Sequence, residues 1–198
     1  MSLNKFSELF VDLDSSNSTN NKIEVLKKYF LSNRPIDNAW TIYLLTGKNN
    51  KRFVSGRYLR DLFSEVYDYP QWLIDTCYLK VGDSAEVISL LLKNRNASET
   101  KKIHKTSLNE LLSKILPELS KLNDEEKKSR IKKAWETLPA DNHLTFNKIL
   151  TGTFRVGVSV GLITKSIAKL INIDEEIISH RLMGCLLYTS PSPRDSMT

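Results

Sequence analysis

The sequence predicts an all-α fold, a single domain of about ten helices. Apolar residues recur three and four positions apart along most of the chain, beginning with Leu3, Phe6 and Phe10, the spacing that puts them on one face of a helix. Only 7 Gly and 6 Pro occur in 198 residues, which disfavours architectures rich in β-turns. No series of alternating strand patterns is present. At 40% hydrophobic and 26% charged residues, the composition is that of a folded domain with a real core.

Helix boundaries are predicted from capping residues. Ser55, Asp83, Ser107 and Asn123 each stand before an apolar run, and the last three are followed by Glu three residues later, as in a capping box. Gly47 and Gly152 stand where left-handed C-cap residues belong, and Pro117 is expected to kink its helix. The segment 153–158 is β-prone and short. The predicted helices cover about 3–13, 22–32, 37–46, 55–67, 70–79, 83–92, 107–121, 123–138, a stretch ending near 152, 161–171 and 174–183.

The charge predicts an anionic partner. The formal net charge is +6 and the isoelectric point is near 9.2, and nucleic acid is the commonest anionic partner of a basic chain. Three segments concentrate this charge: Lys48, Lys51, Arg52, Arg57 and Arg60; Lys101, Lys102, His104 and Lys105; and Lys127, Lys128, Arg130, Lys132 and Lys133. The first is the best candidate for phosphate contacts, because it lies between two predicted helices among small polar residues that let backbone amides approach. The third is also explained as the solvated face of an amphipathic helix.

A second candidate for phosphate contacts is the segment 148–159. Gly157 and Ser159 precede a predicted helix whose first N–H groups are free to bind an anion. Thr153 lies in the same turn, and Arg155 is suited to a bidentate phosphate or minor-groove contact. The alternative is a structural turn with Arg155 in an internal salt bridge, and the residues alone do not decide between the two.

No catalytic or metal site is predicted. Cys77 and Cys185 are too few for a disulfide framework or a zinc site, and Cys77 is expected to be an inert buried thiol. The three histidines, His104, His143 and His180, lie far apart. Neither 46–49 nor 152–158 completes a phosphate-binding loop, since the required Gly-Lys-Ser/Thr is missing from both. Acidic runs at 124–126 and 174–176 lie at predicted helix starts, where they complement the helix dipole.

The N-terminal residues form no secretion signal, and no apolar run is long enough to cross a bilayer. A cytoplasmic protein without a membrane partner is therefore expected.

Four motifs, in order along the chain, give a family resemblance. They are Ala-Trp-x-x-Tyr-x-Leu-Thr-Gly at 39–47, Val-Gly-Asp-Ser-Ala-Glu at 81–86, Leu-Thr-Gly-Thr-Phe-Arg-Val-Gly-Val-Ser at 150–159, and His-Arg-Leu-Met-Gly at 180–184. Together they resemble the N-terminal DNA-binding domain of ATP-dependent DNA ligases, especially the bacterial type. The resemblance covers about residues 3–184, so the helical DNA-binding domain is assigned to 1–184.

The resemblance implies an all-helical domain that holds nicked duplex DNA through backbone phosphates, as a monomer, within an enzyme of repair, replication and recombination. In that family a separate nucleotidyltransferase domain uses ATP and Mg²⁺ through a Lys-x-Asp-Gly lysine. No Lys-x-Asp-Gly occurs in this chain, so no catalytic residue and no cofactor is assigned to it, and the chain is expected to be inactive alone although its parent family is enzymatic. The predicted DNA-binding residues are Lys48, Lys51, Arg52, Arg57, Thr153, Arg155, Gly157 and Ser159.

The segment 185–198 is of another kind. Its first eleven residues, Cys-Leu-Leu-Tyr-Thr-Ser-Pro-Ser-Pro-Arg-Asp, have no helical period and resemble a translated sequencing adapter. We therefore expect a non-native tail on a reading frame that is truncated after Gly184. A natural disordered tail is the alternative.

Two other functions remain open at this point. The first is a helical interaction module whose basic faces bind an acidic protein. The second is a sequence-specific helix-turn-helix regulator, for which no clean pair of short helices with a recognition face is found.

Overall fold

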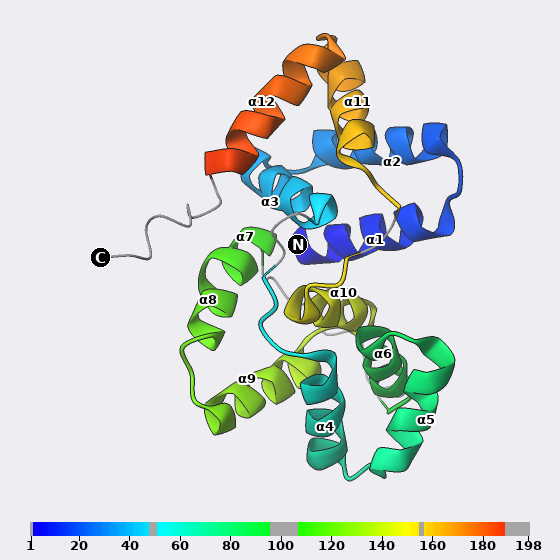
Figure 1. Cartoon of the computed structure of the whole chain (residues 1–198), viewed down its shortest axis with the longest axis vertical. Coiled ribbons are helices and arrows are strands. Elements are labelled where there is room, and N and C mark those ends of the chain that lie inside the picture. Colours follow the sequence, from blue (N-terminus) through cyan, green and yellow to red (C-terminus); the bar gives the residue numbers. More distant parts are fainter. Residues whose placement is uncertain (1, 48–50, 96–106, 155–156, 189–198) are drawn as a thin grey trace. The chain divides into compact units, whose positions relative to one another are not determined.

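The structure is a computed structural model that describes residues 2–47, 51–95, 107–154 and 157–188, without the side chains of Ser2 and 184–188. Every regular element in these ranges is a helix (Figure 1), which confirms the predicted all-α class. The chain divides into two compact units, Met1–Glu8 with Asn50–Phe154 and Leu9–Asn49 with Arg155–Thr198. The first helix, α1 (Ser2–Ser15), contributes to both units.

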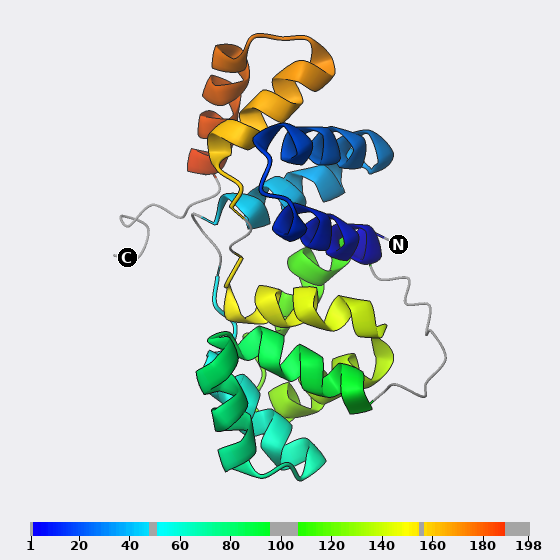
Figure 2. The same ribbon diagram turned by 90° about the vertical axis from the view of Figure 1, so that its right-hand side faces the viewer.

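The first unit contains the beginning of α1 and the helices from α4 to α10. Their bounds are α4 (Gly56–Tyr67), α5 (Gln71–Val81), α6 (Ser84–Arg95), α7 (Leu108–Glu110), the π-helical turn η1 (Leu111–Ile115), α8 (Leu116–Leu119), α9 (Asp124–Thr137) and α10 (Ala140–Thr151). Helices α6 and α10 lie side by side (Figure 2). Trp135 and Phe63 are fully buried and lie edge to face, with ring centroids 6.0 Å apart.

The second unit contains the rest of α1 with α2 (Thr19–Ser32), α3 (Pro35–Thr46), α11 (Val160–Ile171) and α12 (Glu175–Tyr188). Helix α11 packs against both α2 and α12. Tyr29 of α2 shares a hydrogen bond of 2.9 Å with Thr41 of α3, and Thr41 donates to the carbonyl of Asp37. Burial raises the pKa of Tyr29 to about 12, so this hydroxyl stays protonated and the link between the helices is neutral.

Helix α10 is buried on nearly all sides, although six of its nine buried residues are polar. Trp135 Nε1 donates to Asn147 Oδ1 at 2.9 Å, and Asn147 Nδ2 donates to Ser89 Oγ at 3.0 Å. Lys148 Nζ lies 2.8 Å from Asp83 Oδ2. The other carboxylate oxygen of Asp83 accepts the backbone N–H of Ala85 and caps α6. Asn147 and Lys148 of α10 are thus matched by partners on α9, on α6 and at the cap of α6, which fixes the position of α10 between these helices.

Most predicted boundaries are confirmed. Ser55, Ser107 and Asn123 accept the backbone N–H three residues later, and Asn123 forms a complete capping box with Glu126. Gly47 and Gly152 end their helices at φ of 65° and 67°. The caps are well predicted because the capping hydrogen bond is local in sequence.

Four predictions about local structure differ from the structure. No strand occurs in the described part of the β-prone segment 153–158, which has no neighbouring strand to pair with. Before Pro117 the helix contains the π-helical turn η1, in which the Leu116 N–H donates five residues back to Leu111. Pro117 follows directly after this turn, at the beginning of α8. Helices α6 and α12 extend to Arg95 and Tyr188, beyond the predicted ends.

We expect Trp135→Phe to lower the free energy of unfolding by about 2–4 kcal/mol, because it leaves a cavity and strands the buried Asn147 Oδ1 without its donor. Urea unfolding followed by circular dichroism measures the change. Trp72→Phe is the matched control, since Trp72 is 69% exposed in the same unit and its replacement should change stability by less than about 0.5 kcal/mol. Equal effects of the two substitutions would contradict the role given to α10.

Candidate nucleic-acid interface

The first predicted basic segment is held against the end of α10. The backbone N–H groups of Phe53 and Val54 both donate to the Leu150 carbonyl, at 2.9 and 3.1 Å. Val54 is buried, whereas Lys51 and Arg52 are exposed. Residues 53 and 54 are therefore fixed on the end of α10, the two cations before them face solvent, and this stretch lies beside a turn that is about 100 residues away in sequence.

That turn follows α10 and contains Thr153. Gly152 adopts the left-handed conformation, the Thr153 N–H donates to the Lys148 carbonyl at 3.1 Å, and the Thr153 hydroxyl lies 2.8 Å from that of Thr151. Phe154 is buried against Phe6, with centroids 5.9 Å apart. The structure thus brings Lys51, Arg52 and Thr153 into one region of the first unit. The Thr153 hydroxyl is half-buried and holds the turn.

Arg57 and Arg60 differ in what they can contact. Arg57 is 83% exposed at its side chain and lies 3.7 Å from Asp61, so its guanidinium remains open to solvent. Arg60 is only 13% exposed, lies 3.3 Å from Asp75, and stacks over the Tyr78 ring at 4.0 Å. The segment itself contains no acid, but α4 and α5 supply acidic partners. Arg57 stays a candidate for phosphate contact, and Arg60 joins α4 to α5.

In the second unit two of the predicted residues, Gly157 and Ser159, lie at the beginning of α11. Ser159 caps the helix by accepting the Leu162 N–H at 3.2 Å, and Gly157 has a φ of +61°. Lys22 of α2 donates to the Gly157 carbonyl at 3.5 Å, so a cation lies beside the positive end of the helix dipole. Lys22 was not among the predicted site residues, and no local signal in the sequence marks it, because 135 residues separate it from Gly157.

Lys48 and Arg155 lie outside the described residues, as does the second basic segment at 101–105. Lys51, Arg52, Arg57 and Thr153 belong to the first unit, and Gly157 and Ser159 belong to the second.

The third basic segment lies on α9 and contains one cation in ion pairs and three exposed cations. Lys128 lies 2.7 Å from Glu65 of α4 and within 4 Å of Asp124 and Glu125. The hydrogen bond to Glu65 raises the pKa of Lys128, so this ammonium stays charged and links α9 to α4. Arg130, Lys132 and Lys133 are exposed.

The histidines and Cys77, for which no catalytic role was predicted, differ in their burial. His143 is fully buried, its Nε2 lies 3.0 Å from the Trp135 carbonyl, and burial lowers its pKa, so it stays neutral near pH 7. His180 is exposed, and His104 falls outside the described ranges. Cys77 is half-buried and not fully buried as predicted.

Within the part of the chain that the structure describes, no three His, Cys, Asp or Glu side chains gather as metal ligands would. None of the described helices has both the length and the apolar character to cross a membrane.

The fold and the exposed cations define an all-α protein with basic surfaces, and comparison with known families agrees. The family model described as "DNA ligase N terminus" matches residues 2–168. The chain therefore belongs to the DNA ligase N-terminal family of the ATP-dependent ligases, and this family implies an interaction with DNA. No curated protein matches the chain.

Two glycines at the start of α11 should respond in opposite ways to alanine. Gly157→Ala forces a side chain into the left-handed region, and its Cβ would lie 3.0 Å from Lys22 Nζ, so stability should fall by about 1 kcal/mol. Gly161→Ala, in the first turn of α11, meets no atom closer than 3.8 Å and should be neutral or stabilising by up to about 1 kcal/mol. Urea unfolding of both variants tests this, and a loss at Gly161 equal to that at Gly157 would contradict the geometry.

Proposed function

We propose that this chain is the DNA-binding part of an ATP-dependent DNA ligase and holds nicked duplex DNA through its backbone phosphates. The observation that carries the proposal is the basic loop fixed on the end of α10, with Lys51 and Arg52 exposed and Phe53 and Val54 bonded to Leu150. Cations on a preorganised backbone bind phosphates without a large ordering cost. The family match supports the same conclusion.

The second unit supplies a matching element in this proposal. Backbone N–H groups at the start of α11, the exposed Ser159 and the nearby Lys22 favour a phosphate at that helix end. Because such contacts read no base edges, binding should tolerate any sequence and weaken steeply with salt.

We assign no ATP or Mg²⁺ site to this chain in the proposal. No metal-ligand cluster is found among the described residues, and the sequence contains no Lys-x-Asp-Gly. We therefore assign adenylylation and nick sealing, in repair, replication or recombination, to a catalytic part of the ligase that this sequence does not include.

The proposal predicts that Arg52→Ala weakens binding to nicked duplex severalfold and makes the slope of log Kobs against log salt shallower by about 0.9, the value of one lost phosphate contact. Fluorescence anisotropy with a labelled nicked duplex, from about 50 to 200 mM salt, measures both quantities. Lys51→Ala should behave alike.

Lys80→Ala is the matched control, because Lys80 is an exposed cation at the end of α5 outside the proposed interface, and its loss should leave the slope unchanged. If the control lowers affinity as much as Arg52→Ala does, the binding reflects net charge only and the proposed interface is wrong. An intact duplex of the same sequence, measured alongside, tests the preference for a nick.

A further inference from the structure

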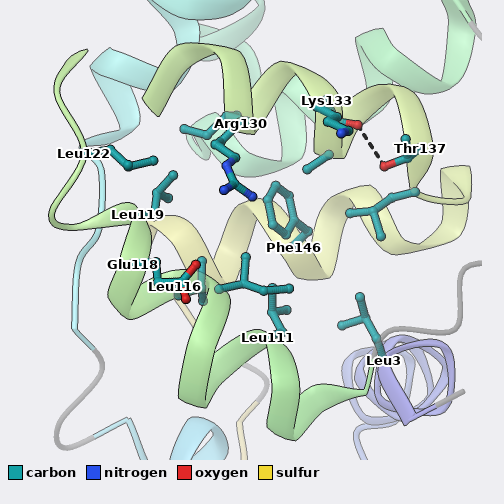
Figure 3. A pocket seen from close by; sticks show the side chains of 14 residues that line it. Leu3, Leu111, Leu116, Glu118, Leu119, Leu122, Arg130, Lys133, Thr137 and Phe146 are labelled. Carbon is teal, nitrogen blue, oxygen red and sulfur yellow. Dashed lines mark hydrogen bonds between the residues drawn. The ribbon is translucent and has the colours of Figure 1, made fainter. Parts of the chain in front are cut away.

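A pocket of about 180 Å³ opens in the first unit, and none of its lining residues belongs to the basic loop or to the turn after α10. Its walls come from η1, α8, α9 and α10, with Leu3 of α1 at one side (Figure 3). The apolar lining includes Leu111, Leu119, Ile131 and Phe146, all of which are buried. The pocket is therefore an apolar hollow on a basic protein.

Its size suits one large side chain. An apolar cavity of about 150 Å³ is large enough to bind benzene. This pocket therefore has room for one aromatic ring and little more. The wall beside Leu111 and Ile115 is the π-helical turn η1, and Ile115 remains 37% exposed at the pocket. Single π-helical turns recur at functional sites, and here the turn shapes the pocket wall.

Two cations lie at the edge of this pocket. Arg130 and Lys133, three residues apart on α9, both line it, and both are exposed. In Figure 3 the Arg130 side chain reaches from α9 toward the apolar residues. Neither cation forms an ion pair among the described residues, and Glu118, which also lines the pocket, pairs with neither. The edge thus has uncommitted positive charge.

The apolar pocket and the two cations at its edge together distinguish between possible anionic partners. DNA phosphates would pair with Arg130 and Lys133 but would leave the apolar pocket empty, since sugar and phosphate do not fill it. An acidic peptide with one aromatic residue satisfies both features, because the ring removes apolar surface from water and the flanking carboxylates pair with the cations.

We propose that this pocket is a docking site for an acidic peptide segment of a partner protein. One aromatic side chain of the segment enters the pocket, and carboxylates beside it pair with Arg130 and Lys133. None of the residues that line the pocket belongs to the proposed DNA interface, and the test of the pocket does not depend on DNA binding.

The test uses the full chain and two fluorescein-labelled peptides of Asp and Glu residues, one with a central Phe and one with Ala in its place. Fluorescence polarisation should show the Phe peptide binding at least tenfold more tightly than the Ala peptide. Lys133→Glu should weaken the Phe peptide at least tenfold. Lys132→Glu makes the same charge change at an exposed neighbour that does not line the pocket, so it should weaken binding less than threefold.

Ala134→Leu, which fills the pocket from α9, should abolish the preference for Phe over Ala. Thermal unfolding shows whether the Ala134→Leu variant folds. If that variant does not fold, the charge variants at the exposed Lys132 and Lys133 test the proposal instead. Equal affinity for the two peptides, or equal effects of Lys132→Glu and Lys133→Glu, would overturn the proposal. A third result would also overturn it: the protein binds nicked duplex but not the Phe peptide, and Lys133→Glu, but not Lys132→Glu, removes the binding of the duplex. That result would assign the edge cations to DNA.

Discussion

The structure of the first unit depends on a polar helix that is buried. Helix α10 has Asn147, Lys148 and Thr151 where a core helix would ordinarily have apolar side chains. Such groups are costly to bury unless each finds a partner. Trp135 of α9 and Ser89 of α6 meet Asn147, and Asp83 meets Lys148. Directional hydrogen bonds accept only one arrangement, so they fix how α6, α9 and α10 pack where apolar contacts alone would allow sliding.

This arrangement positions the candidate interface. The Leu150 carbonyl near the end of α10 accepts two N–H groups from the loop after residue 50. Thr151 is anchored to the Asn147 carbonyl and to Thr153, so the turn after α10 is continuous with the buried polar network. The proposed phosphate-binding segments of the first unit are therefore held by its core. A protein that binds DNA without reading its sequence gains affinity in this way, because less conformational entropy is lost on binding.

The same core helix connects to the second surface. Phe146 of α10 lines the pocket between α8 and α9, and Arg130 and Lys133 supply its charge. Lys128, on the same helix, is instead committed to Glu65. A run of basic residues on one helix thus divides into a structural cation and cations that are available to a partner.

Features that depend on residues close together in sequence could be predicted, and features that depend on distant residues could not. Caps at Ser55, Ser107 and Asn123 involve residues three positions apart, so they were predicted with the helices themselves. The basic loop and the turn at Thr153 were each identified from composition and family motifs. Their contact through Leu150 could not be predicted, because it joins segments about 100 residues apart.

Longer-range features show the same limit more strongly. The place of Lys22 beside Gly157, the internal role of Arg60 and the pocket under Arg130 have no sequence signature. Each arises where two or more helices meet. A prediction from periodicity and charge runs identifies which residues are basic, but it does not separate those used in packing from those left for a ligand.

Hydrogen–deuterium exchange on the chain with and without a nicked duplex tests the central claim most directly. The account predicts added protection in peptides covering 51–57 and 157–163, and none at the end of α5, where Lys80 serves as an internal reference. Protection confined to α9, or absent from both proposed segments at saturating DNA, would contradict the account.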